Sequence, residues 1–107
     1  GPSMNEMLRQ AQKMQEDMQA KQAELEAKEY DVSAGGGAVK IKINGKREVL
    51  AIDISPEIVD PDDIETLSDI MVAAINEAIK KVNADSDAEM QKLAGPLGGM
   101  GSISGLF

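Results

Sequence analysis

Hydrophobic residues follow a heptad-like spacing through residues 4–28. The apolar positions are Met4, Met7, Ala11, Met14, Met18 and Leu25. Apart from Leu8, Ala20 and Ala23, the positions between them are polar, and no Gly or Pro interrupts the segment, so the pattern predicts a long helix with a narrow apolar seam. A helix of about 25 residues is about 37 Å long. That length exceeds the reach of a compact domain of this size, so we expect part of the helix to project or to pair with another chain.

Residues 29–55 change to the alternation of strands. A short strand is predicted at residues 30–32, and Gly35, Gly36 and Gly37 break it. Residues 38–43 alternate apolar and basic side chains. Asn44-Gly45 is the preferred pair for a two-residue type I′ turn, which predicts that residues 46–54 return antiparallel.

That turn fixes a register for the predicted hairpin. It pairs Ile43 with Lys46, Ile41 with Glu48, and Val39 with Leu50. The apolar residues of the two strands then share one face: Val39, Ile41, Ile43, Leu50, Ile52 and Ile54. On the opposite, wetter face the same register pairs Lys42 with Arg47 and Lys40 with Val49.

A second helix is predicted from residue 61 to residue 83. Pro56 ends the preceding strand, Asp60 is a good N-cap, and Pro61 suits the first helical position. Further on, Ser86 and Glu89 fit a capping box, which would mark a restart or a kink.

These elements give an α+β fold: a long N-terminal helix, a three-stranded antiparallel meander and a C-terminal helix. We expect one domain over residues 4–94. Residues 95–107 are rich in Gly and carry no charge, and we expect them to form a flexible tail. Gly1, Pro2 and Ser3 are typical of what remains after a protease removes an affinity tag, so we leave them outside the domain.

The charge is strongly acidic overall but unevenly distributed. The formal net charge is −8, from 11 basic and 19 acidic residues, which argues against nucleic-acid binding because phosphate contacts need basic residues. One stretch, residues 53–69, is acidic without any basic residue. The candidate phosphate-binding residues are Lys40, Lys42, Lys46 and Arg47, with Arg9 and Lys13 of the first helix as a second set. The alternative is that the strand lysines are ordinary solvated charges that discourage aggregation.

Catalytic chemistry finds little support in the sequence. The chain has no His and no Cys, so the commonest general base, the thiol nucleophile and the usual zinc ligands are missing. The start of a helix explains Asp60, Asp62 and Asp63 better than a paired-acid site does. Only Tyr30 and Phe107 are aromatic, which leaves no platform for stacking single-stranded bases. We expect a protein that is not an enzyme and that needs neither cofactor nor metal.

The seam of the first helix, residues Met7, Ala11, Met14 and Met18, has three interpretations. It can pack in an ordinary core, form the seam of a homodimer, or serve as a Met-rich groove for other partners. Core packing is the default for apolar residues at helical spacing, and the strictly heptad-like step over residues 4–18 favours the dimer seam over the groove.

Several segments of the sequence resemble one family throughout. They are residues 7–19 (MLRQAQKMQEDMQ), 37–45 (GAVKIKING), 52–56 (IDISP), 67–78 (LSDIMVAAINEA), 98–100 (GGM) and 105–107 (GLF). Together they are similar to the YbaB/EbfC family and follow its order over nearly the whole chain. The resemblance implies a homodimer with projecting helices that binds duplex DNA and is associated with the nucleoid in the bacterial cytoplasm. It also implies a link, through gene neighbourhood, to recombination and replication proteins.

Two functions follow from these observations. The first is a nucleoid-associated homodimer that binds duplex DNA mainly through phosphates, with a role in nucleoid organisation or gene regulation. The alternative is a dimeric adaptor, in which the acidic stretch and the apolar seam dock recombination or replication factors.

Overall fold

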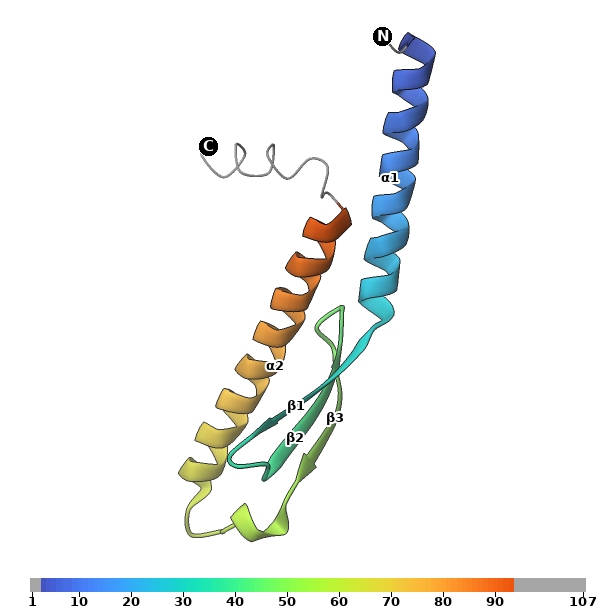
Figure 1. Ribbon diagram of the computed structural model, residues 1–107. Helices are drawn as coiled ribbons and strands as arrows, with labels where there is room; N and C mark the ends of the chain where they lie inside the picture. Colours follow the sequence, from blue (N-terminus) through green and yellow to red (C-terminus); the bar gives the residue numbers. More distant parts are fainter. Residues whose placement is uncertain (1–2, 94–107) are drawn as a thin grey trace, which may run out of the picture.

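The computed structural model describes residues 3–93, which form two helices and a three-stranded sheet (Figure 1). The elements are α1 (Met4–Ala27), β1 (Glu29–Ala34), β2 (Val39–Asn44), β3 (Val49–Ile54), the short 3-10 helix η1 (Pro56–Ile58) and α2 (Ile64–Leu93). The strands form an antiparallel meander in the order β1-β2-β3. The predicted α+β class and its order of elements are therefore confirmed. The predicted tail, residues 95–107, lies outside the described residues.

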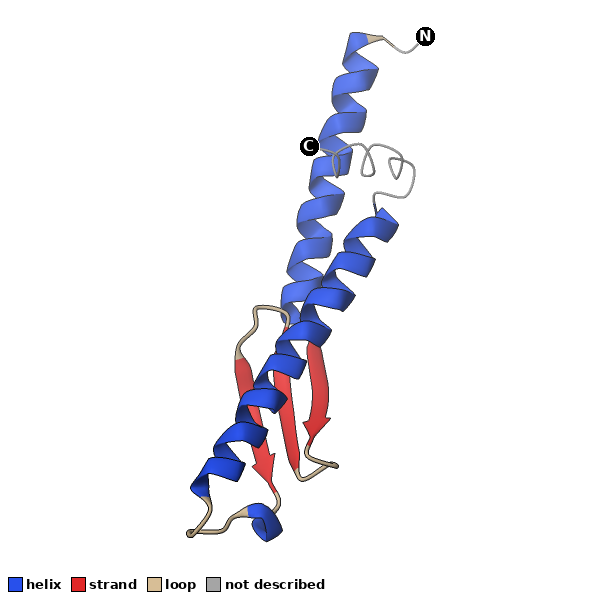
Figure 2. Cartoon of the chain, turned by 90° about the vertical axis from the view of Figure 1, so that its left-hand side faces the viewer, coloured by secondary structure: helices blue, strands red, loops and turns tan. Residues whose placement is uncertain are grey.

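The core lies between α2 and one face of the sheet, which α2 crosses (Figure 2). Val39, Ile41 and Ile43 of β2 alternate with exposed residues and are fully buried. Ala74, Ala78 and Val82 face them from α2, and the two small alanines let the helix approach the strands closely. Every second residue of β2 and every fourth residue of this part of α2 therefore point into one apolar layer.

The β2–β3 turn differs from the prediction, and so does the register. The loop has three residues, Gly45 to Arg47, and Arg47 adopts the left-handed conformation with φ of 65°, as in a type I turn followed by a left-handed residue. Asn44 supports this loop, because its Oδ1 accepts hydrogen bonds from the amides of Lys46 at 2.9 Å and Glu48 at 3.0 Å. The predicted type I′ turn is wrong.

The longer loop shifts every predicted pair. Ile43 lies opposite Val49, Ile41 opposite Ile52, and Val39 opposite Ile54, with a bulge that leaves Leu50 unpaired. Ile52 and Ile54 therefore do share the face of the β2 core residues. The predicted pairing of Lys42 with Arg47 and of Lys40 with Val49 is wrong, since Lys42 lies opposite Ala51 and Lys40 opposite Asp53.

Helix α2 begins later and ends later than predicted. Asp63 caps it, because its carboxylate accepts hydrogen bonds from the amide of Thr66 at 3.2 Å and from the Thr66 hydroxyl at 2.7 Å. Asp60 instead forms a local turn in which its Oδ1 accepts from the amide of Asp62 at 2.9 Å. The helix continues without a break through Ser86 and Glu89 to Leu93, so the proposed restart there is also wrong.

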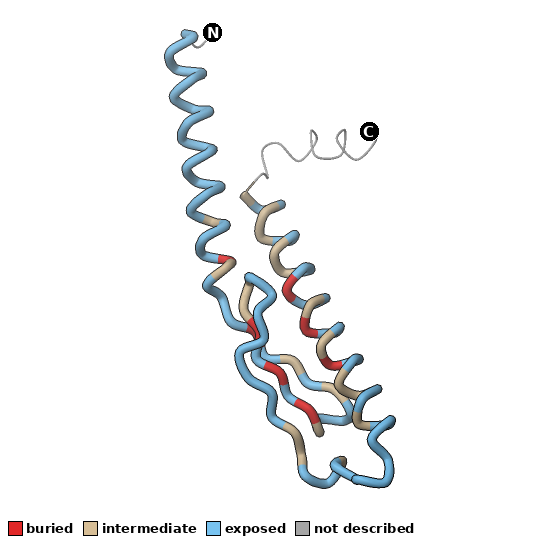
Figure 3. Tube along the Cα trace, turned by 180° about the vertical axis from the view of Figure 1, so that it is seen from behind, coloured by how far each residue is buried: buried red, intermediate tan, exposed pale blue. Residues whose placement is uncertain are grey.

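Helix α1 extends away from this layered body (Figure 3). Of its residues only Leu25 is buried, and residues 4–20, which we call the arm, are exposed throughout. The radius of gyration is 20.1 Å, against about 13 Å for a compact domain of about 100 residues. Ser3 caps the arm, because its Oγ accepts a hydrogen bond from the amide of Glu6 at 3.2 Å.

Candidate nucleic-acid interface

The arm carries the first pair of candidate cations, Arg9 and Lys13. They lie one helical turn apart, so they share one face of α1. Neither takes part in an ion pair within residues 3–93. Acidic residues are also present on the arm at Glu6, Glu16 and Asp17. The two cations remain available to an external anion.

The outer face of the sheet carries Lys40 and Lys42, which are exposed on the side away from α2. Each has at least one acidic neighbour. Lys42 Nζ lies 3.8 Å from Glu29 Oε1, and Asp31 is its cross-strand neighbour. Asp53 lies opposite Lys40. Opposite charges directly across strands attract each other, so this face is close to neutral rather than basic.

Lys46 and Arg47 occupy the β2–β3 turn, apart from the strand lysines. The Arg47 Nε donates a hydrogen bond to Asn83 Oδ1 on α2 at 2.8 Å. Lys46 and Arg47 line a cleft of about 500 Å³ where the turn meets the two helices. The other residues that line it are Gln22, Leu25, Glu26, Gly45, Ser86 and Met90. The six candidate cations therefore occupy three separate places, and the structure does not gather them into one patch.

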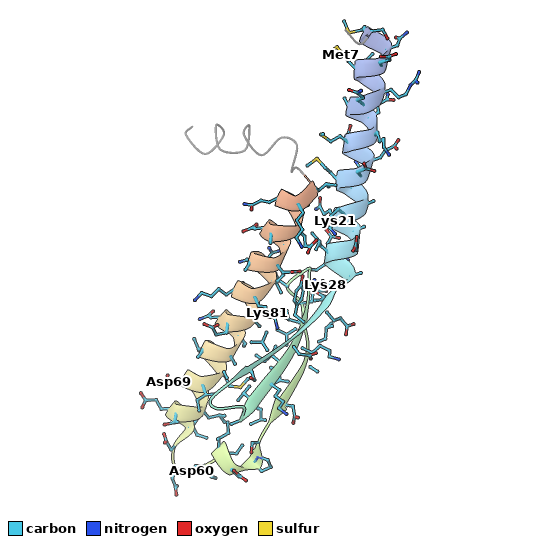
Figure 4. All side chains as sticks on the ribbon, viewed as in Figure 1. Met7, Lys21, Lys28, Asp60, Asp69 and Lys81 are labelled. Atoms are coloured by element: carbon cyan, nitrogen blue, oxygen red, sulfur yellow. The ribbon has the colours of Figure 1, made fainter. Side chains whose placement is uncertain are left out.

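The acidic stretch lies at the opposite end of the molecule from the arm. In Figure 4, Asp60 and Asp69 lie at the end with η1 and the start of α2, and Met7 lies at the other. We call this end, residues 53–69, the acidic pole. The longest dimension of the molecule is 72 Å, so the acidic pole and the arm are separated by most of it.

A polar cluster that sequence reasoning missed joins α1, β1 and α2. The Oδ2 of Asp85 accepts hydrogen bonds from Lys28 Nζ at 2.8 Å and from the Tyr30 hydroxyl at 2.6 Å. The bonds from Lys28 and then Tyr30 hold the pKa of Asp85 below its usual value. Burial, and then the bond to Asp85, raise the pKa of Tyr30 to about 12. No local pattern relates these residues, because Asp85 lies 57 and 55 positions along the chain from Lys28 and Tyr30.

A second ion pair links the same two helices. Lys21 Nζ lies 3.0 Å from Glu89 Oε2, and Lys92 Nζ lies 3.1 Å from the other oxygen of Glu89. Hydrogen bonds from Lys21 and then Lys92 lower the pKa of Glu89, and its acceptance of the Lys21 bond raises the pKa of Lys21. In the sequence, Lys21 only interrupts the apolar seam of the first helix, so its spacing gives no sign of this partner.

Metal and membrane sites have no counterpart in the described part of the chain. Within residues 3–93, no three His, Cys, Asp or Glu side chains gather closely enough to hold a metal ion. No helix in the same residues is long and apolar enough to cross a bilayer.

Comparison with known proteins relates the chain to one group. The model of the YbaB/EbfC DNA-binding family matches residues 1–97. A nucleoid-associated protein of Clostridium novyi is 52% identical over 107 residues, covering 100% of this chain and 90% of the relative. One from Alkaliphilus metalliredigens is 51% identical, covering 99% of this chain and 90% of the relative. An uncharacterized protein from Helicobacter pylori shares the fold, with a TM-score of 0.70 at 16% identity, covering 87% of this chain and 98% of that one.

Proposed function

The chain belongs to the YbaB/EbfC DNA-binding family, and from this premise we propose that it binds duplex DNA as a homodimer, without a cofactor and mainly through phosphates. We further propose that it is associated with the bacterial nucleoid, where it contributes to nucleoid organisation or gene regulation. The single observation that carries the proposal is the family match over residues 1–97, supported by relatives that bear the name nucleoid-associated protein. What needs a physical explanation is how so acidic a chain can approach DNA.

The net charge of −8 does not act at one place. The acidic pole, residues 53–69, lies at the opposite end of the molecule from Met7 (Figure 4). The molecule is 72 Å long. At physiological ionic strength the Debye length is about 8 Å, so charges this distant barely affect a phosphate at the arm. Binding therefore depends on the local balance of charge, and on the arm this is only −1, from Arg9 and Lys13 against Glu6, Glu16 and Asp17.

The arm is the favoured contact surface. Its two cations are exposed and form no ion pair within the described residues. Each strand lysine, by contrast, has one acidic cross-strand neighbour: Asp31 on β1 for Lys42 and Asp53 on β3 for Lys40. We propose Arg9 and Lys13 as the principal phosphate contacts, with Lys46 and Arg47 at the turn as secondary ones and Lys40 and Lys42 as the weakest candidates. Contacts of this kind fix position on the duplex without reading its sequence.

A homodimer is supported by apolar surface that a single chain leaves in water. Helix α2 packs on β1 and β2, while most of β3 is exposed. The exposed fractions are 41% for Val49, 47% for Leu50 and 41% for Ile52. Several exposed apolar side chains on an edge strand are typical of a protein–protein interface, so we propose that two copies meet at β3. The seam at Met7, Ala11, Met14 and Met18 stays a second predicted contact, since it too is exposed in one chain.

A second candidate function is an adaptor for recombination or replication proteins. The observation that favours it is the acidic pole, where Val59 and Ile64 are 49% and 55% exposed among the carboxylates. Such a surface suits a basic partner with apolar anchors. Recovery of a specific partner from a lysate treated with nuclease would favour this function over DNA binding.

A titration against a labelled duplex tests the main proposal. We expect binding at about 50 mM salt that weakens by about a hundredfold or more at about 200 mM, because each phosphate contact releases counterions. Sedimentation of the same sample should give the mass of two chains. Failure to bind a duplex even at low salt, or sedimentation as a single chain, would refute the proposal.

A further inference from the structure

Helix α1 is attached to the rest of the chain at one end only. The arm is exposed, and Leu25 is the one buried residue of the helix. The polar ties in this region are two ion pairs to α2, from Lys21 and Lys28, and one backbone hydrogen bond from the Gly45 amide to the Lys28 carbonyl at 2.9 Å. Figure 4 shows Lys21 and Lys28 at the end of α1 that lies beside α2. The direction of the arm thus depends on a small number of contacts.

Lys28 is the residue at which the chain changes direction. It is the C-cap of α1, with extended backbone angles of φ −69° and ψ 141°, and β1 begins at the next residue. Its ammonium group lies 2.8 Å from Asp85 Oδ2 and 5.3 Å from the centre of the Tyr30 ring. Asp85 therefore binds both this turning point and Tyr30, which is only 5% exposed and belongs to the core.

The second tie lies one turn further along α2. Glu89 follows Asp85 by four residues, and Lys21 precedes Lys28 by seven, so the two ion pairs form successive links between helices that run in opposite directions. A rigid helix attached in this way is a lever. At 1.5 Å per residue, Arg9 lies about 28 Å from Lys28 along the axis, and a tilt of about 20° would move it by about 10 Å.

We propose that Asp85 and Glu89 are positioning residues that set the direction of α1 through Lys28 and Lys21. Apart from the hydrogen bond of Tyr30 to Asp85, which the amide oxygen of an asparagine can still accept, the core does not depend on these ties, because its packing lies between α2 and the sheet. Partly exposed ion pairs contribute little to folding, so their loss changes the angle of α1 while the fold persists. A consequence, which rests on the proposed function, is that they also determine where Arg9 and Lys13 meet DNA.

Spin-label distances in the full chain, measured without DNA, test the inference. The chain has no cysteine, so Gln12→Cys on the arm and Asn76→Cys on α2 provide two unique labels at exposed positions. Labelled chains are mixed with an excess of unlabelled chains so that distances within one chain dominate. We expect one narrow distribution, and in Asp85→Asn/Glu89→Gln a broad distribution whose centre moves by several ångströms.

Glu77→Gln is the matched control. It makes the same change of carboxylate to amide on α2, and the Glu77 ion pair at 3.7 Å joins it to Lys80 of the same helix. We expect its distance distribution to equal that of the unsubstituted protein. Circular dichroism should show the same helix and strand content in all three proteins.

Charge reversal separates positioning from simple damage. Glu89→Lys places a positive charge opposite Lys21 and should broaden the distribution, and the double variant Lys21→Glu/Glu89→Lys should narrow it again. An unchanged distribution in Asp85→Asn/Glu89→Gln would overturn the inference whether or not the protein binds DNA. If the distribution broadens as expected, duplex affinity should fall about fivefold, and equal affinity would overturn the consequence for Arg9 and Lys13.

Discussion

The amide nitrogen of Gly45 lies 2.9 Å from the carbonyl oxygen of Lys28, so the β2–β3 turn contacts the end of α1 directly. No side chain fits between them: a Cβ atom on Gly45 would lie 1.7 Å from the carbonyl oxygen of Leu25. Gly45 does not have a positive φ. This position therefore requires glycine because two backbones approach each other closely, and not because of its own conformation.

Gly45→Ala should accordingly be strongly destabilising. The added methyl group meets backbone atoms of Leu25 and Glu26, which cannot move without displacing the end of α1. We expect the free energy of unfolding to fall by about 3 kcal/mol, at the upper end of the cost of overpacking. Urea unfolding followed by circular dichroism measures the change.

Gly36→Ala is the control for that substitution. A Cβ atom added to Gly36 would meet no other atom within 4 Å, but the φ of this residue is +68°. Only the left-handed backbone should therefore oppose alanine, at a cost of about 1 kcal/mol. A larger loss for Gly36→Ala than for Gly45→Ala would contradict the importance of the contact between the turn and α1.

The hairpin illustrates what sequence patterns can and cannot predict. Alternation correctly predicts the strands and puts Ile52 and Ile54 on the face of Ile41. Asn44-Gly45 indicates the wrong turn because local preference alone does not decide the conformation. In the structure Gly45 packs against the backbone of α1, which is distant in sequence. The left-handed backbone conformation of the turn falls on Arg47 instead.

The candidate site is less predictable than the fold because it, too, depends on contacts between residues that are distant in sequence. Arg9 and Lys13 can be placed together because helical spacing is local. The acidic neighbours of Lys40 and Lys42 depend on the pairing of β2 with both of its neighbours, and the longer turn shifts the register of β2 with β3. The contact of Tyr30 with Asp85 joins residues that no local pattern relates.

The Tyr30–Asp85 bond predicts a specific response to alkali. The pKa of Tyr30 is raised to about 12, whereas an unfolded chain ionises tyrosine near the usual value of about 10. The neutral phenol favours the folded state, so this contribution is fully present below about pH 10 and is lost as the pH rises toward about 12. Urea unfolding over this range should show a steeper loss of stability in the unsubstituted protein than in Tyr30→Phe. Parallel curves for the two proteins would contradict the assignment.

The proposed dimer contact at β3 predicts a monomeric variant. Ile52 is 41% exposed on the part of the sheet that α2 leaves uncovered. Ile52→Glu should put a charge into the contact between copies while leaving the core of one chain in place, and sedimentation should give the mass of a single chain. Val72→Glu is the control, because Val72 is also apolar and is 60% exposed, but lies on α2 rather than on β3. Dissociation by Val72→Glu alone would move the interface to the helix.

The three sets of cations predict three different losses of duplex affinity. Arg9→Gln/Lys13→Gln removes four charges from a dimer, and if all four contact phosphates the salt dependence should weaken by about 3.6 in the slope of log affinity against log salt. Affinity at low salt should fall at least about tenfold.

Lys40→Gln/Lys42→Gln should change affinity by less than about threefold, because Glu29, Asp31 and Asp53 already offset these charges. The loss of affinity in Lys46→Gln/Arg47→Gln should lie between these two. Lys80 forms an ion pair with Glu77 on α2, and Lys80→Gln should leave affinity unchanged. A larger loss from the strand lysines than from the arm would show that DNA lies on the sheet, and would remove α1 from the interface.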